Sequence, residues 1–320
     1  MKVLLAGATG AIGRSLIKSL RLAGHTIFGM VRSQSSSAPL SDSGAESVIA
    51  DALDASSVSA AVAKVRPDVI INELTSLPKH YTPTDMKAAA ERDARLRLEG
   101  NKNLIAAAQQ TGVRRFLVQS TGFWYAPGGG LADEGERFAY GASPAVAAGA
   151  QRYAQLEAMT LGRTEFEAVA LRYGFFYGPG TWFISDGDMG EQVRQQQVPI
   201  IGRGQGVWSW IHIDDAADAT VRALDCMPGP YNIVDNNPSE QRVWLTAFAR
   251  YCRALEPPHI SEQQALQSTG PDTVYYATQL RGASNAKAKR ELGFRPRPLQ
   301  WLVHTTGTTD ALEIFVPRER

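Results

Sequence analysis

The stretch VLLAGATGAIG, residues 3–13, decides the fold of this chain of 320 residues. Its first four residues are apolar, which is typical of a strand buried on both faces of a parallel sheet. Gly7, Gly10 and Gly13 follow this run, and apolar residues then recur at helical spacing as far as Leu20. The stretch therefore predicts a strand, a tight turn and a helix in direct succession.

The spacing of these glycines is typical of a dinucleotide site. Gly7 permits the turn, Gly10 lets the backbone approach a pyrophosphate, and Gly13 lets the helix pack against the strand. The amides of the first helical turn would then bind the phosphates. The residues expected at this site are Gly7, Thr9, Gly10, Ala11, Ile12 and Gly13. An ordinary glycine-rich turn is the alternative interpretation.

Short apolar runs alternate with helical patterns through the first half of the chain, which predicts a parallel sheet covered by helices. The expected strands are Val3–Ala6, Thr26–Val31, Ser47–Ala50, Val69–Asn72, Phe116–Ser120 and Val169–Tyr173. One long helix is predicted over Thr84–Gln110. The fold class is therefore α/β, with a Rossmann-type doubly wound parallel sheet.

After Gly178 this rhythm breaks into shorter pieces, with helices predicted near Asp214–Leu224 and Val243–Leu255. We expect residues 1–178 to form the NAD(P)-binding domain. Residues 179–320 would form mainly a smaller C-terminal lobe, with segments that return to the first domain.

Composition narrows the partners of the chain. The formal net charge is +1, from 33 basic and 32 acidic residues, so charge gives no reason to expect nucleic acid or a membrane. No apolar run approaches the ~20 residues of a membrane span, and the run that opens the chain is too short for a signal peptide. Cys226 and Cys252 lack the spacing of a redox or metal motif. We expect a cytoplasmic protein without a metal.

The end of the second predicted strand distinguishes NAD from NADP. An NAD site places an acidic residue there, which binds the ribose 2′-hydroxyl. This chain has Arg32 and Ser33, and no carboxylate before Asp42. A guanidinium suits a 2′-phosphate, so NADP(H) is the preferred cofactor and NAD(H) a possible one. Arg32 as a merely solvated strand end is the alternative.

Three motifs, GATGAIG, LRYGFFYGPG and WIHIDDAADAT, together resemble the extended short-chain dehydrogenase/reductase family, the NAD(P)-dependent epimerase/dehydratase group. The resemblance covers about residues 1–295. It implies a Rossmann domain with a smaller, substrate-binding C-terminal lobe. It also implies that His212–Asp215 anchors the lobe to the main domain, with a structural role for the histidine.

The resemblance extends the cofactor site beyond the glycine turn. The residues it implies there are Asp51 and Ala52 at the adenine, Asn72 and Leu74 after the fourth strand, and Arg172, Phe175 and Tyr177 on the nicotinamide side. Phe175 departs from the family, which commonly has Asn at this position.

The catalytic Tyr-x-x-x-Lys pair of the family is absent. Aligned on Glu157, its two positions hold Gly149 and Tyr153. None of the ten tyrosines has a lysine four residues later, and no lysine lies between Lys102 and Lys287. Without such a charge, a tyrosine with a pKa of about 10 is a poor acid–base catalyst at neutral pH.

Other hydroxyl groups must then serve the site. The resemblance makes Thr121 the hydroxyl that contacts a substrate oxygen, with Ser120 beside it. Tyr153 would donate a hydrogen bond to the nicotinamide ribose in place of the lysine. Further candidates for the substrate-facing hydroxyl are Tyr125, Tyr140 and Tyr177, although a tyrosine at such a position is more often a core or pocket aromatic than an acid.

Aromatic residues stand at loop and edge positions that the family places around its substrate. They are Trp124, Tyr140, Trp182, Phe183, Trp208 and Trp210. As a group they favour a flat, apolar substrate, although ordinary packing is the alternative for each.

Three functions fit these observations. The first is an NADP-dependent carbonyl or conjugated-ketone reductase acting on a small aromatic or secondary metabolite that needs little acid catalysis. The others are a non-catalytic NADP-binding redox sensor, and an epimerase or isomerase that retains its cofactor. The expected partner is a small molecule, and a homodimer is possible. The substrate and the direction of the reaction stay open.

Overall fold

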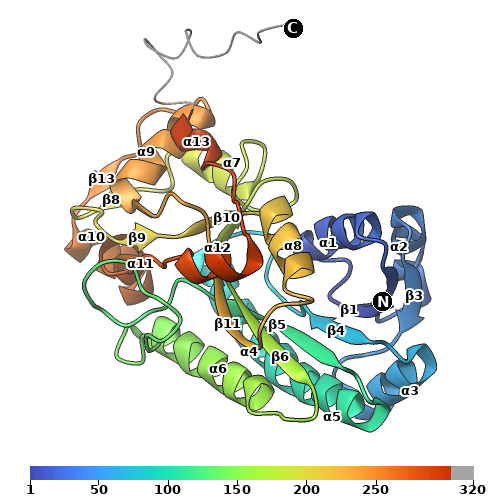
Figure 1. The fold of residues 1–320 in the computed structure, drawn as a ribbon. Helices are drawn as coiled ribbons and strands as arrows, with labels where there is room; N and C mark the ends of the chain where they lie inside the picture. Colours follow the sequence, from blue (N-terminus) through green and yellow to red (C-terminus); the bar gives the residue numbers. More distant parts are fainter. Residues whose placement is uncertain (304–320) are drawn as a thin grey trace, which may run out of the picture.

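The computed structural model describes residues 1–303, without the side chains of Ala38 and Pro39 (Figure 1). Its centre is a seven-stranded sheet in the order β11-β6-β5-β4-β1-β2-β3, and every neighbouring pair is parallel. The strands are β1 (Lys2–Ala6), β2 (Thr26–Val31), β3 (Glu46–Ile49), β4 (Val69–Asn72), β5 (Arg115–Thr121), β6 (Glu167–Tyr173) and β11 (Gly229–Ile233). The strand order reverses between β1 and β4, which confirms the predicted Rossmann-type fold.

Helices cover both faces of the sheet (Figure 1). One layer contains α1 (Ala11–Leu22), α2 (Ala38–Ser43), α8 (Ile213–Arg222) and α12 (Ala286–Leu292); the other contains α3 (Ala55–Val65), α4 (Pro83–Arg95), α5 (Asn101–Thr111) and α6 (Pro144–Leu161). Successive strand residues face opposite layers. In β1, Val3 and Leu5 belong to the core under α1 and α8, whereas Leu4 and Ala6 belong to the core under α3, α5 and α6.

The long helix predicted over 84–110 is confirmed as α4 and α5, joined without a break by a π-helical turn at Leu96–Gly100. Such turns are frequent near functional sites. This one includes Arg97, whose side chain is buried.

The chain leaves the main sheet after β6 and builds a lobe of short elements. Three two-stranded ladders pair β7 (Phe175–Tyr177) with β10 (Trp210–His212), β8 (Ile200–Ile201) with β13 (His259–Ile260), and β9 (Val207–Trp208) with β12 (Ser239–Glu240). The lobe helices are α7 (Asp188–Arg194), α9 (Gln241–Tyr251), α10 (Glu262–Ser268), α11 (Pro271–Thr278) and α13 (Gln300–Val303). Aromatic side chains dominate the core of this lobe, among them Trp210, Trp244 and Phe248.

Segments beyond residue 178 return to the main sheet. Helix α8 packs against α1, α12 packs against β11, and β11 pairs with β6 at the edge of the sheet. A helix near α8 was expected, but β11 was not, because its sequence GPYNI begins with a glycine and a proline. Proline is tolerated in an edge strand, where one side of the backbone needs no partner. Residues 304–320 of the predicted lobe lie outside the described residues.

Candidate active site

The glycine turn lies between β1 and α1 at the carboxyl edge of the sheet. A Cβ atom at Gly7 would lie 2.5 Å from the carbonyl oxygen of Glu73, and one at Gly13 would lie 2.3 Å from that of Gly7. Packing within the protein therefore requires these two glycines. Gly10 differs, because the only nearby atom would be the Gly7 oxygen at 3.2 Å.

Gly10 leaves open space at the start of α1, where Thr9 and Gly10 are both exposed. Gly10 is the N-cap of this helix and provides no side chain to bond the first helical amides, which are left free for a ligand. An open backbone approach beside free amides is what a pyrophosphate requires. The predicted residues of the turn thus fit a dinucleotide.

Arg32 and Ser33 follow β2 and are exposed. Within residues 1–303 no hydrogen bond or ion pair holds the Arg32 guanidinium, whereas the Ser33 hydroxyl lies 2.9 Å from that of Ser35. Asp51 and Ala52 come just after β3; the former is exposed and the latter buried.

The carboxyl ends of β4 and β5 bring further predicted residues close to the turn. The Asn72 side chain donates to the Asn101 side chain at 2.8 Å and accepts from the Leu74 amide at 3.1 Å, so it fixes the backbone that follows β4. Thr121, the last residue of β5, is buried, and its hydroxyl has no hydrogen-bond partner among the described residues. A buried unpaired hydroxyl is costly unless a ligand completes it.

Glu73 is a buried carboxyl group that sequence reasoning did not single out. It follows β4 beside Gly7, and its Oε1 accepts a hydrogen bond from the Tyr173 hydroxyl at 3.0 Å. Its Oε2 has no partner in the described part of the chain. Burial raises the pKa of Glu73 to about 8, so this carboxyl is mainly protonated at neutral pH.

Several other predicted hydroxyl and guanidinium groups are already bonded within the protein. Arg172 pairs with Glu157 through two bonds, of 2.8 Å and 2.6 Å. The Ser120 hydroxyl donates to the same carboxylate at 2.5 Å. The Tyr125 hydroxyl donates to Asn232 and accepts from Arg172. These contacts make a buried network below the site.

The network argues against Tyr125 as a proton donor. Burial raises the pKa of Tyr125 to about 12, and its proton is already used in the bond to Asn232. The Ser120 hydroxyl likewise donates its hydrogen bond to the Glu157 carboxylate, so this proton is not available to a substrate. Both roles stay sequence predictions that the geometry does not favour.

Gly149 and Tyr153, the two positions that the family resemblance assigns to the tyrosine and the lysine, lie on α6, and a tryptophan fills the space beside Gly149. A Cβ atom at Gly149 would lie 2.2 Å from Cζ3 of Trp124 and 2.5 Å from its Cη2. The indole therefore lies where a side chain at position 149 would begin. Its ring centroid is 5.7 Å from that of Tyr153, one turn further along the helix.

Tyr153 has a buried cation beside it, although it is not a lysine. The guanidinium carbon of Arg97 lies 5.1 Å from the Tyr153 ring centroid. Arg97 donates to Asp93 at 2.7 Å and to Gln119 at 3.3 Å. The Tyr153 hydroxyl makes no hydrogen bond to another described residue. Arg97 thus fixes the ring while the hydroxyl stays available.

Sequence analysis did not find Arg97. The only signal is the Asp93-x-x-x-Arg97 spacing, which permits an ion pair on a helix. The segment ERDARLRLEG holds several such charges, and its pattern does not tell which of them face inward.

The predicted aromatic residues fall into two groups. Phe183, Trp208 and Trp210 are buried in the lobe core, as is Tyr177, whose ring packs against Trp301. Trp124 and Trp182 are only half-buried. Tyr140 is 46% exposed and lies away from this cluster, at a surface hollow beside α6. The direct substrate contacts predicted for the fully buried residues stay untested predictions.

Phe175 connects the main domain and the lobe. Its ring stacks on Phe123 and on Trp208, with centroid distances of 4.1 Å and 4.2 Å. The ring centroid of Phe123 is in turn 5.2 Å from that of Trp124. An aromatic residue where the family has Asn therefore belongs to a continuous aromatic wall from β5 to the lobe.

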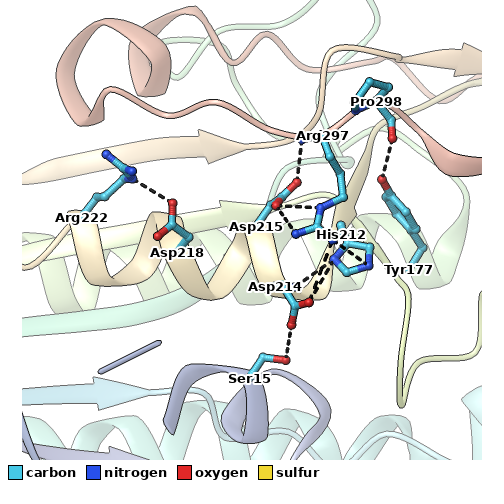
Figure 2. Close-up of polar contacts among 9 residues, drawn as sticks. All are labelled: Ser15, Tyr177, His212, Asp214, Asp215, Asp218, Arg222, Arg297 and Pro298. Atoms are coloured by element: carbon cyan, nitrogen blue, oxygen red, sulfur yellow. Dashed lines mark hydrogen bonds and ion pairs between the residues drawn. The ribbon is translucent and has the colours of Figure 1, made fainter. Parts of the chain in front are cut away.

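Figure 2 shows the segment His212–Asp215 at the start of α8. His212 Nδ1 accepts the Asp214 amide at 3.1 Å, which caps the helix, and burial lowers the pKa of His212, so the ring is neutral. Asp214 accepts from Ser15 of α1 at 2.9 Å, and Asp215 pairs with Arg297 at 2.8 Å. These contacts join α1, the start of α8 and the segment before α13, and they fit the anchoring role that the resemblance predicts for His212–Asp215.

Comparison with known proteins identifies the family. The model of the NAD-dependent epimerase/dehydratase family matches residues 3–233. The chain belongs to this family. It is 36% identical over 304 residues to 3-diazoavenalumate denitrifying reductase of a Streptomyces species, a match that covers 94% of this chain and 98% of that protein. The chain is an NAD(P)-dependent oxidoreductase of the extended short-chain dehydrogenase type.

Solved structures agree with the fold. UDP-glucose 4-epimerase of Thermotoga maritima, solved with UDP-glucose, aligns with a TM-score of 0.70 at 18% identity, over 94% of this chain and 95% of its own. UDP-glucose 4-epimerase of Thermus thermophilus, in complex with NAD, aligns with a TM-score of 0.67 at 21% identity, over 96% and 99%. These low identities establish the architecture alone. The family and the glycine turn together assign a nicotinamide dinucleotide as the cofactor.

Residues 1–303 contain neither a membrane-spanning helix nor a cluster of metal-binding side chains. No helix there is long and apolar enough to cross a membrane. No group of three or more histidine, cysteine, aspartate or glutamate residues is arranged to hold a metal ion.

Proposed function

We propose that the chain is an NADPH-dependent reductase of a small aromatic substrate whose reduction requires no proton from a tyrosine–lysine pair. The observation that carries this proposal is the geometry at the two α6 positions that the family resemblance assigns to that pair. Gly149 has no side chain, Trp124 occupies the space above it, and Tyr153 stands in the lysine position. An enzyme rebuilt in this way suits a substrate that accepts hydride without general acid catalysis.

The choice of NADPH rests on Arg32. It is exposed at the end of β2, no described residue bonds it, and no acidic residue follows before Asp42. A free guanidinium at this position is suited to bind the 2′-phosphate in two hydrogen bonds.

The substrate class follows from the relative. Its name describes a diazo compound that is reduced with loss of nitrogen. We therefore propose an aromatic diazo compound, reacting as its diazonium cation, in place of the carbonyl compound that the sequence alone suggests. Bound NADPH would supply a hydride to the ring carbon, dinitrogen would leave with the C–N bonding pair, and no proton would be consumed. A reaction that consumes no proton would explain why the chain has no tyrosine–lysine pair to supply one.

The residues of the chain would hold and shield these reactants. The turn at Gly7–Gly13 would bind the pyrophosphate, and the Tyr153 hydroxyl would bond the nicotinamide ribose. The unpaired Thr121 hydroxyl would orient the substrate, and the aromatic wall from Trp124 to Phe175 would pack against its ring. Residues 1–178 as cofactor domain, the lobe as substrate domain and a homodimer remain part of the proposal.

The test is turnover of 3-diazoavenalumate with NADPH that carries deuterium at C4. We expect loss of NADPH absorbance, release of dinitrogen, and deuterium at the ring carbon that carried the diazo group. An aromatic aldehyde, 4-hydroxybenzaldehyde, serves as the carbonyl comparison. Gly10→Val is the matched negative control, because its side chain would fill the space of the pyrophosphate.

Two results would count against the proposal. Reduction of the aldehyde without reduction of the diazo compound would show that the electrophile is a carbonyl group after all. Tight NADPH binding without oxidation by either compound would favour the redox-sensor alternative.

A further inference from the structure

We propose that Tyr276 of lobe helix α11 donates a hydrogen bond to an acceptor oxygen of the substrate, and that Trp124 holds it in place. This inference rests on the proposed function, since it concerns how the same substrate is bound. The tyrosine that faces the substrate would then lie on α11 of the lobe, whereas the resemblance places it on α6.

The first step concerns the space at Gly149. Three ring atoms of Trp124 lie within 2.9 Å of the position that a Cβ atom would take there. The six-membered end of the indole is therefore pressed against α6, at the place where the family tyrosine is attached. Trp124 contacts the core under α6 and the core of the lobe, so it spans the junction between the two.

The second step concerns the other end of the indole. Its Nε1 donates a hydrogen bond to the Tyr276 hydroxyl oxygen at 3.0 Å. An indole N–H is a donor only, so the phenol oxygen is the acceptor and its own proton is not used in this bond. That hydroxyl makes no second hydrogen bond within residues 1–303. Its proton is therefore available to a ligand.

The third step concerns the rigidity of Tyr276. Its ring meets Trp208 edge-on at 5.6 Å and Phe175 at 6.0 Å. Its carbonyl oxygen accepts from Trp208 Nε1 at 2.9 Å. The side chain is nonetheless half-buried and not sealed in the core. A fixed hydroxyl within an aromatic wall is a binding group that loses little entropy when it meets a ligand.

The fourth step concerns charge. Burial raises the pKa of Tyr276 well above its usual value, so the phenol stays protonated and acts as a donor. It therefore selects an acceptor, such as the carboxylate, phenolate or carbonyl oxygen of a flat substrate, and provides no negative charge.

The experiment compares Tyr276→Phe with Tyr275→Phe. Both remove one hydroxyl from neighbouring residues of α11, but the Tyr275 side chain is buried in the core of the lobe, so removal of its hydroxyl should leave the Kd and the KM unchanged. The binding probe is avenalumate, which lacks the reactive diazo group. Its binding is measured by tryptophan fluorescence in the presence of NADP⁺. We would also measure the KM and kcat for 3-diazoavenalumate and the Kd for NADPH for each variant.

We expect Tyr276→Phe to raise the Kd for avenalumate and the KM for the diazo compound about tenfold, the scale of one hydrogen bond. The Kd for NADPH and kcat should change less than twofold. Trp124→Phe, which keeps a ring over Gly149 but removes the indole donor, should shift the KM in the same direction without changing the Kd for NADPH.

Unchanged Kd and KM in Tyr276→Phe would overturn the inference, and so would a parallel loss in Tyr275→Phe. Failure of the unaltered protein to bind avenalumate or to oxidise NADPH would instead overturn the proposed function. The two failures are thus distinguishable.

Discussion

Arg32 is a single exposed side chain on which a cofactor preference depends. We predict that Arg32→Ala weakens NADPH binding about ten- to hundredfold, because a charged hydrogen bond contributes ~1.5–3 kcal/mol, and leaves NADH binding unchanged. Fluorescence titration with both cofactors measures this. Lys18→Ala, which removes an exposed cation from α1, is the control and should alter neither. Equal affinity of the unaltered protein for the two cofactors would contradict the prediction.

Residues fixed by local pattern could be predicted from the sequence. Gly7, Gly10 and Gly13 belong to one turn, so neighbouring residues suffice to place them, whereas Thr121 was singled out by the family resemblance. Tyr276 could not be found, because its partner Trp124 is 152 residues away along the chain. A contact at such separation leaves no periodic trace in either segment.

Helix α6 shows how an element can be constrained by a neighbour. In an exposed helix, Gly→Ala stabilises by about 1 kcal/mol. At Gly149, however, the added Cβ would meet the Trp124 ring at 2.2 Å, and overpacking of this kind costs ~1–3 kcal/mol. We predict a net loss of up to about 2 kcal/mol in the free energy of unfolding, together with a raised KM.

Urea unfolding followed by tryptophan fluorescence tests the prediction for Gly149→Ala. Ala148→Gly, at the exposed neighbouring position of α6, is the reference for helix propensity alone and should cost about 1 kcal/mol. A more stable Gly149→Ala protein with normal turnover would show that Trp124 moves aside freely.

The elements themselves were predictable where their patterns are strong. The six expected strands are confirmed within two residues at each end, because apolar runs bounded by polar residues mark buried parallel strands. The strand β11 was missed because Gly229 and Pro230 disfavour a strand by local propensity, and its pairing with β6 overrides that preference. The paired lobe strands of two or three residues carry too little pattern to be recognised.

Stability of the whole molecule should depend on pH through Glu73. The pKa of this carboxyl is about 8 in the folded protein, against a usual 4.5. Between these values the folded state holds a proton that the unfolded state releases. The contribution of Glu73 to the free energy of unfolding is therefore fully present below about pH 4.5. It decreases as the pH rises towards 8, by at most ~1.4 kcal/mol per pH unit.

Glu73→Gln isolates this contribution, because an amide resembles the protonated acid in shape but does not titrate. We expect its free energy of unfolding to fall less steeply with pH than that of the unaltered protein between pH 5.5 and 7.5. Urea titrations across that range measure the difference in slope. Parallel curves for the two proteins would mean that Glu73 is ionised in the folded state.

The position of β11 at the sheet edge also has a consequence for synthesis of the chain on the ribosome. Strand β6 is complete by residue 173, but its outer partner is not available until residue 233 has emerged. Until then β6 is an open edge of a largely buried strand, and the face of α1 that packs on α8 lacks its cover. An open apolar edge of this kind is prone to pair with other chains. The seven-stranded sheet is therefore completed only after part of the lobe has been made, and we expect the nascent chain to be most prone to aggregate in that interval.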